Sequence, residues 1–194
     1  MTSAAADFAP RLDPDARSNL LQLAHDSIRH GLDHGRPLPV RAADFPEPLR
    51  ALRASFVTLE RQGALRGCIG HLEAVAPLVQ DVAENAFAAA FRDPRFPPLT
   101  EPELAGLALH ISVLTPATAL EFESEQDLVA QLRPGIDGLI LQEGAARGTF
   151  LPSVWESLPE PRQFLAQLKR KAGLPSDHWS DRIRVLRYET EAFG

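Results

Sequence analysis

The sequence predicts an α+β protein in which antiparallel strand pairs alternate with helices of unequal length. Strand-like segments occur in adjacent pairs, the first being residues 55–61 and 65–70. A short Gln62-Gly63 turn joins these two and predicts a β-hairpin. The helical segments between the strand pairs differ in length, which favours α+β over a regular alternation of strand and helix.

The two long helices are predicted from their termini and their apolar spacing. Asp13-Pro14-Asp15 offers an N-cap carboxylate and a proline in the first turn, and Gly31 and Gly35 are expected to end this helix. Residues 1–12 before it are expected to form a flexible arm. Pro77 opens the clearest helix, in which apolar residues recur at spacings of three and four until Asp93-Pro94.

Shorter elements follow from capping signals, glycines and β-branched runs. In chain order they are a short helix with a Thr100–Glu103 capping box, a buried strand at 107–114, a short helix from Ser124, strands near 139–141 and 149–151, a helix at 162–172 ending at Gly173, and a last strand at 183–190.

Composition excludes several classes of function. The formal net charge of −6 and a pI near 5.5 disfavour nucleic-acid binding. A single cysteine excludes an internal disulfide and any multi-cysteine cluster, and it suits a reducing cytoplasm. The chain has no apolar run of about 18 residues, no Gly-rich phosphate loop and no GxSxG or HExxH motif. We therefore expect a cytoplasmic protein with no membrane contact, no metal and no cofactor.

The hexapeptide LRGCIG at residues 65–70 is the strongest candidate site. In a regular strand, Arg66 and Cys68 share one face, while Leu65 and Ile69 point to the core on the other. Gly67 and Gly70 are expected to remove bulk around the thiol. Arg66 could then activate the Cys68 thiol or bind a carboxylate or phosphate. The alternative is a small buried cysteine with no chemistry.

Histidines near the hexapeptide are weaker candidates. His71 would form a Cys–His dyad only if a bulge broke the strand alternation, because residues 68 and 71 otherwise face opposite sides. His110 lies in the strand at 107–114 and would face Cys68 if the two strands were neighbours, although a satisfied structural histidine is the favoured interpretation. His30 and His34 have helical metal-ligand spacing without a third ligand.

The segment Asp93-Pro94-Arg95-Phe96 is too restricted by proline for an ordinary linker. One interpretation is a loop that displays Arg95 and Phe96 as a wall of the site. The other is a rigid helix stop with Phe96 buried in the core.

Taken together, these motifs resemble the AMMECR domain family, the Alport–midface hypoplasia–elliptocytosis chromosomal-region proteins, whose prokaryotic members are called AmmeMemoRadiSam system protein A. The resemblance rests on the hexapeptide, on Asp93-Pro94-Arg95-Phe96, and on weaker motifs in the same order. Those weaker motifs are Ser112-Val113-Leu114, Thr149-Phe150-Leu151-Pro152, Lys171-Ala172-Gly173-Leu174, Trp179 and Tyr188.

The resemblance implies a large domain, formed by residues 13–120 and 178–194, with an antiparallel sheet and flanking helices. It also implies a smaller inserted α+β domain at 121–177. It implies that the hexapeptide faces a cleft between the domains, and that a MEMO-like protein and a radical S-adenosylmethionine enzyme are partners. The expected site residues are Arg66, Gly67, Cys68, Ile69, Gly70, Asp93, Arg95, Phe96 and His110.

Two functions compete at this site. The preferred one is a binding module that holds a small anionic ligand or a partner. The alternative is a cysteine-dependent enzyme in which Cys68 is catalytic and Arg66 holds an anionic substrate. No base or second acid accompanies Cys68 in the sequence, which favours binding over catalysis.

Overall fold

The computed structural model describes residues 11–194 and confirms the α+β class. The chain divides into two compact units. We call the first, which runs to Leu114 and resumes at residues 191–194, the N-terminal unit. The second, residues 115–190, is the C-terminal unit. Within residues 11–194, no helix is long and apolar enough to cross a membrane.

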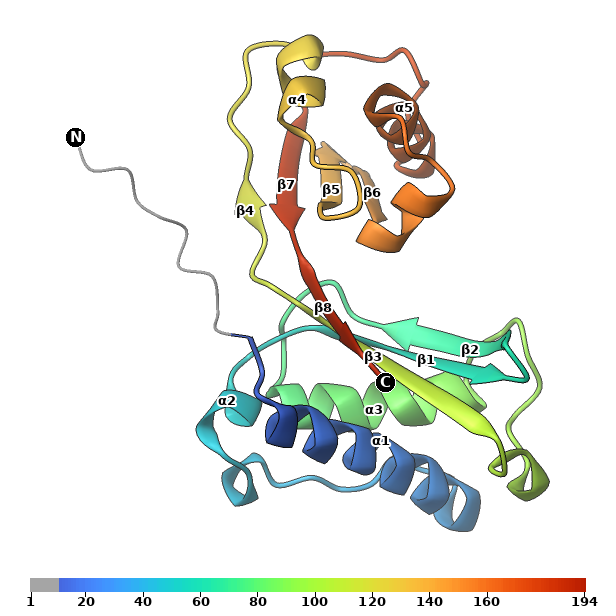
Figure 1. Ribbon diagram of the computed structural model, residues 1–194. Helices are drawn as coiled ribbons and strands as arrows, with labels where there is room; N and C mark the ends of the chain where they lie inside the picture. Colours follow the sequence, from blue (N-terminus) through green and yellow to red (C-terminus); the bar gives the residue numbers. More distant parts are fainter. Residues whose placement is uncertain (1–10) are drawn as a thin grey trace. The chain divides into compact units, whose positions relative to one another are not determined.

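The N-terminal unit is a four-stranded sheet with helices packed on one face (Figure 1). Its strand order is β2-β1-β3-β8. The elements in chain order are α1 (Pro14–His34), a 3₁₀ turn (Ala42–Asp44), α2 (Glu47–Arg50), β1 (Ser55–Arg61), β2 (Ala64–Gly70), α3 (Leu78–Phe91), a 3₁₀ turn (Glu101–Glu103), β3 (Leu107–Leu114) and β8 (Thr190–Phe193). Strand β2 is therefore an edge strand.

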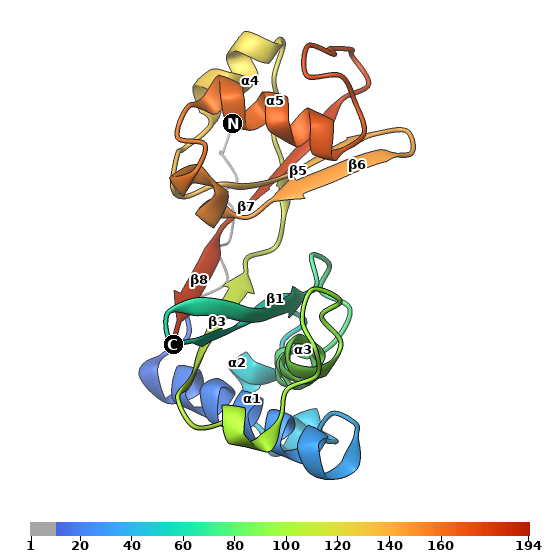
Figure 2. The same cartoon turned by 90° about the vertical axis from the view of Figure 1, so that its right-hand side faces the viewer.

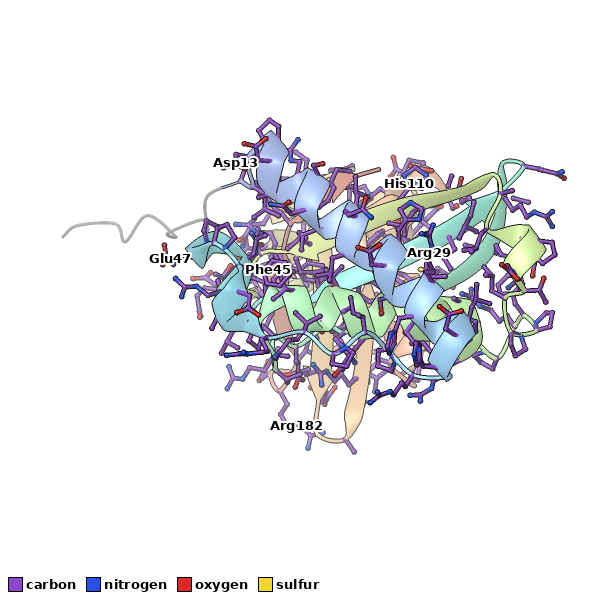
Figure 3. All side chains as sticks on the ribbon, turned by 90° about the horizontal axis from the view of Figure 1, so that it is seen from below. Asp13, Arg29, Phe45, Glu47, His110 and Arg182 are labelled. Atoms are coloured by element: carbon purple, nitrogen blue, oxygen red, sulfur yellow. The ribbon has the colours of Figure 1, made fainter. Side chains whose placement is uncertain are left out.

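Helix α1 begins where the capping signal predicts. The Asp13 carboxylate accepts a hydrogen bond from the Ala16 N–H at 2.7 Å, and Figure 3 shows Asp13 at the start of the helix. Gly35 ends the helix at a φ of 67°. Gly31 does not end it, contrary to expectation: it is buried inside the helix, where an added Cβ would collide with the rings of Phe87 and Phe91.

The core of the N-terminal unit lies between the sheet and helices α1 and α3. Val57 and Leu59 of β1 alternate with Thr58 and point toward the helices, as Ile111 of β3 does. The opposite surface of β2, β1 and β3, which we call the outer face, carries the intervening side chains. Phe56, Thr58, Cys68, His110 and Ser112 belong to it.

The C-terminal unit is a second four-stranded sheet, of order β4-β7-β5-β6, with its own apolar core. Its elements are β4 (Thr118–Ala119), α4 (Glu125–Gln131), β5 (Gly138–Glu143), β6 (Ala146–Phe150), a 3₁₀ turn (Pro152–Glu156), α5 (Pro161–Lys171) and β7 (Arg184–Tyr188). Figure 2 shows α4 and α5 on the same side of this sheet.

The last expected strand is wrong in one respect, because it is two strands in two sheets. Two hydrogen bonds between Thr115 and Glu189 hold the chain where β7 ends and β8 begins. The Thr115 N–H donates to the Glu189 carbonyl, and the Thr115 hydroxyl accepts from the Glu189 N–H, both at 2.9 Å. Strand β7 then pairs with β5, so residues up to Thr190 belong to the C-terminal unit. The two compact units meet at 114/115 and 190/191. The domain boundaries at 120/121 and 177/178 stay a prediction of the resemblance.

The expected arm at residues 1–12 falls mostly outside the described residues. Its last residue does not fit the expectation, because Leu12 is buried in the core and its N–H donates to the Glu191 carboxylate at 3.1 Å.

Candidate functional site

The hexapeptide lies on edge strand β2, at the end of a tight hairpin. Gln62 and Gly63 have φ values of 55° and 76°, as a type I′ turn requires. The pairing of β2 with β1 is regular from Gly70 to Gly67, and its register then shifts by one residue. Arg66 is the extra residue, as in a β-bulge.

This bulge corrects the predicted alternation. Cys68 lies on the outer face opposite Thr58, and Ile69 faces the core opposite Val57, as expected. Leu65, however, pairs with Glu60 and remains 43% exposed, so it does not anchor the core. Arg66 is instead buried, at 9% exposure, next to the buried Gly67.

The two glycines serve packing and do not open an approach to the thiol. A Cβ on Gly67 would collide with the backbone carbonyl of Ala89 in α3, so glycine lets the helix lie close to the strand. A Cβ on Gly70 would collide with the Phe56 ring. The expectation that these glycines clear space around Cys68 is therefore wrong.

The Cys68 thiol is partly exposed on the outer face. Its side-chain partner is Thr58, whose hydroxyl donates to Sγ at 3.3 Å. His110 lies in the same row, opposite Thr58 on the next strand, with its Nε2 3.8 Å from the Glu60 carboxylate. Two strand spacings separate Cys68 from His110, roughly 9 to 10 Å, so the imidazole cannot take the thiol proton directly.

Asp93 and Arg95 hold the backbone of Cys68 at the open edge of β2. The Cys68 N–H donates to the Asp93 carboxylate at 2.9 Å, and Arg95 Nη2 donates to the Cys68 carbonyl at 3.2 Å. Arg95 also donates to both carboxylate oxygens, at 2.9 and 2.7 Å. The two side chains thus take the place of a neighbouring strand.

The same contacts keep Asp93 ionised. The hydrogen bonds from the Arg95 side chain, helped by the backbone N–H groups of Cys68 and Arg95, hold the pKa of this buried carboxyl well below its ordinary value against the opposing effect of burial.

Arg66 is engaged in the same way by Glu103. Its Nε and Nη2 donate to the two oxygens of that carboxylate at 2.8 and 3.2 Å, and Nη2 also donates to the Pro97 carbonyl at 3.0 Å. These bonds, with those from Thr100 in the capping box, lower the pKa of Glu103 to about 2. Because the Arg66 guanidinium is already paired with the Glu103 carboxylate, it is not a free anion-binding group.

The interpretation of this loop as a wall of the site stays a prediction, whereas the one that buries Phe96 in the core is wrong. The Phe96 ring is half-buried and lies 5.9 Å from the Arg66 guanidinium carbon and 5.5 Å from that of Arg95. The aromatic side chain therefore packs on the two arginines that support the hexapeptide.

Sequence reasoning missed a buried polar network that begins at His71. Asp81, on α3, is 1% exposed, and one of its oxygens lies 2.6 Å from His71 Nδ1. Its other oxygen accepts from the Ser55 N–H and hydroxyl and from Asn85 Nδ2, at 2.8, 2.6 and 2.9 Å. The signal was present: Asp81 and Asn85 stand four residues apart on the apolar face of the helix.

This network also decides the Cys–His question. His71 is bonded on the α3 side of the sheet, whereas Cys68 lies on the outer face. The predicted argument against a dyad therefore agrees with the geometry. Among the described residues, no three His, Cys, Asp or Glu side chains are arranged to hold a metal ion.

The fold and site define an α+β protein in which an edge strand displays LRGCIG and two carboxylate–arginine pairs support it. The AMMECR1 family profile matches residues 21–193. A protein of Methanothermobacter thermautotrophicus is 41% identical over 96% of this chain and 97% of its own length. A protein of Thermofilum pendens is 36% identical over 94% and 91%. The chain belongs to the AMMECR1 family.

A solved structure is similar as well. The crystal structure of an uncharacterized protein from Pyrococcus horikoshii has a TM-score of 0.79 and 35% sequence identity to this chain. The similarity covers 90% of this chain and 88% of the other. Both the predicted family and the predicted fold class are thereby confirmed.

Proposed function

We propose that this AMMECR1-family protein is a binding module whose outer face, around Cys68 and His110, contacts a partner protein. One observation carries the proposal. The Cys68 thiol is displayed on the sheet surface, where the Thr58 hydroxyl donates a hydrogen bond to it, and its backbone is held rigidly from the strand edge by Asp93 and Arg95. Rigid display without a nearby base suits recognition better than nucleophilic catalysis.

The ion pairs of Arg66 and Arg95 favour a partner protein over a small anion as the ligand of the outer face. Arg66 and Arg95 were the expected anion-binding groups, and each is already bonded to a carboxylate. These pairs occupy Nε and Nη2 of each guanidinium, and the remaining nitrogen of Arg66, Nη1, is buried without a hydrogen-bond partner among the described residues. A small anion at Nε or Nη2 would have to displace Glu103 or Asp93, which costs an established charge-assisted hydrogen bond. A partner protein can contact the partly exposed thiol, the exposed imidazole of His110 and neighbouring side chains without breaking either pair.

The family resemblance supplies the candidate partners, a MEMO-like protein and a radical S-adenosylmethionine enzyme. That the hexapeptide faces a cleft between the domains also stays a prediction of that resemblance.

A retention experiment tests the proposal. The tagged protein is immobilised as wild type, as His110→Glu on the outer face, and as Arg29→Glu on the exposed side of α1; Figure 3 shows both positions. We expect the wild type and Arg29→Glu to retain a candidate partner and His110→Glu to lose most of it. Equal retention by all three, or none by the wild type, counts against the proposal.

A further inference from the structure

The C-terminal unit contains a cavity of about 370 Å³ that lies apart from the hexapeptide. It forms where the chain after β4 leaves β7: the Leu120 N–H still donates to the Val185 carbonyl at 2.9 Å, and the two segments then separate (Figure 1). Its volume falls at the lower end of the range for small-molecule sites.

Charged side chains of mainly one sign line this cavity. Glu121, Glu123 and Asp181 contribute three carboxylates, and Arg184 contributes one guanidinium. All four residues are exposed, and within residues 11–194 none of them forms an ion pair. Unpaired like charges around a concave surface create a negative potential that attracts cations.

An aromatic wall completes the cavity. Trp179 and Phe122 both line it, with ring centroids 5.7 Å apart. Trp179 is further fixed by the fully buried Lys169, whose Nζ lies 5.5 Å from the indole centroid and 2.6 Å from the Glu125 carboxylate. A half-buried indole beside carboxylates is a favourable surface for an organic cation.

The acidic side chains around this cavity are not arranged as a divalent-metal site. A divalent metal needs several oxygen or nitrogen ligands converging on one point, and no such group of three acidic, His or Cys side chains exists among the described residues. A larger cation that spans the carboxylates and covers an indole fits this arrangement better.

We propose that this cavity binds an organic cation, a guanidinium or alkylammonium group, between Trp179 and the carboxylates of Glu121, Glu123 and Asp181. The group can belong to a free small amine or to a basic side chain of a peptide. This site is independent of the partner-binding function proposed for the outer face.

NMR titration of the ¹⁵N-labelled full chain tests the proposal directly. The protein has two tryptophans. Trp155 is buried, and its indole N–H donates to the Asp137 carbonyl at 2.7 Å, so its signal is an internal control for Trp179. Agmatine represents the free amine, an acetylated and amidated Arg-Ala-Ala peptide represents the side chain, and succinate is the anionic control.

We expect agmatine or the peptide to shift the Trp179 indole signal with a Kd on the order of 1 mM, and to leave that of Trp155 unchanged. Whichever of the two binds more tightly identifies the source of the cation. Binding should weaken about fivefold for each carboxylate removed in Glu121→Gln and Glu123→Gln, and further at high salt. Glu156→Gln, an exposed site outside the cavity, should not change it.

Three results would overturn the proposal. The first is a Trp179 signal that does not respond to either cation at concentrations well above the expected Kd. The second is equal affinity in the wild type and the double Glu121→Gln, Glu123→Gln variant, whose folding the unchanged Trp155 signal reports. The third is a stronger response to succinate than to the cations, which would assign the cavity to Arg184 instead.

Discussion

The Asp93 carboxylate accepts a hydrogen bond from the backbone N–H of Cys68 at 2.9 Å, across 25 residues of chain. Arg95, bonded to the same carboxylate, returns a bond to the Cys68 carbonyl at 3.2 Å. An ion pair thus satisfies the donor and acceptor that an edge strand leaves open at the centre of the hexapeptide. The Asp93-Pro94-Arg95-Phe96 motif therefore supports the LRGCIG strand from its open edge.

Removing the charge of Asp93 should destabilise the N-terminal unit. Asp93→Asn keeps the shape of the side chain but leaves Arg95 without its anion. We expect a loss of about 2 to 4 kcal/mol in the free energy of unfolding, measured by urea denaturation. Asp33→Asn removes the same charge at an exposed position of α1 and should change stability by less than about 0.5 kcal/mol. Similar losses in both variants would contradict the structural role of the pair.

Acid should weaken the same support through Glu103. Because its pKa in the folded protein, about 2, lies below the ordinary value of 4.5, its ion pair stabilises fully above about pH 4.5. That contribution is lost as the pH falls toward 2.

A variant can isolate this effect. Glu103→Gln should be less stable than the wild type at pH 7 by about 1 to 3 kcal/mol, and the two should converge near pH 2. Glu101→Gln, in the same 3₁₀ turn but exposed, should show no such convergence in urea midpoints measured at several pH values. A constant difference between the wild type and Glu103→Gln down to pH 2 would show that the carboxylate charge is not what matters.

Within the hexapeptide, replacing Gly67 should lower the stability of the protein more than replacing Leu65. Gly67→Ala places a methyl group against the Ala89 carbonyl and should cost about 1 to 3 kcal/mol, because helix or strand must move. Leu65→Ala, at a 43% exposed position, should cost less than about 1 kcal/mol. Thermal unfolding of the two variants compares them, and the reverse order would restore the predicted alternation in which Leu65 anchors the core.

The reactivity of the Cys68 thiol should not depend on His110. Thr58 is the hydrogen-bond partner of the Cys68 thiol, and His110 lies two strands away. We therefore expect the rate at which Cys68 reacts with iodoacetamide at pH 7 to lie within about tenfold of the rate of a small model thiol. His110→Ala should leave that rate unchanged. A rate far above the model thiol that depends on His110 would favour the cysteine-enzyme alternative over the binding module.

Much of the fold follows from signals that act over a few residues. The Asp13 cap, the Gln62-Gly63 turn and the Thr100–Glu103 capping box all lie where the sequence predicts them. Each depends on contacts between near neighbours in the chain, so a single sequence contains the information.

The parts that could not be predicted depend on distant partners. The bulge that buries Arg66 is accompanied by an ion pair with Glu103, 37 residues away, and the break before β8 is held by Thr115, 74 residues from Glu189. The role of Gly67 depends on how closely α3 approaches β2. The alternation of residues along a strand cannot predict the bulge, the break before β8 or the packing of Gly67.

The single cysteine allows the most direct test of the proposed binding face. Cys68 in the free protein and in its complex with a candidate partner is labelled with a maleimide over time. If the partner covers the outer face, the labelling rate should fall by about tenfold or more in the complex. Arg29→Cys in a Cys68→Ser background, on the exposed side of α1, should label equally in both states. An intact complex in which Cys68 labels as fast as in the free protein would contradict the proposal that this face binds the partner.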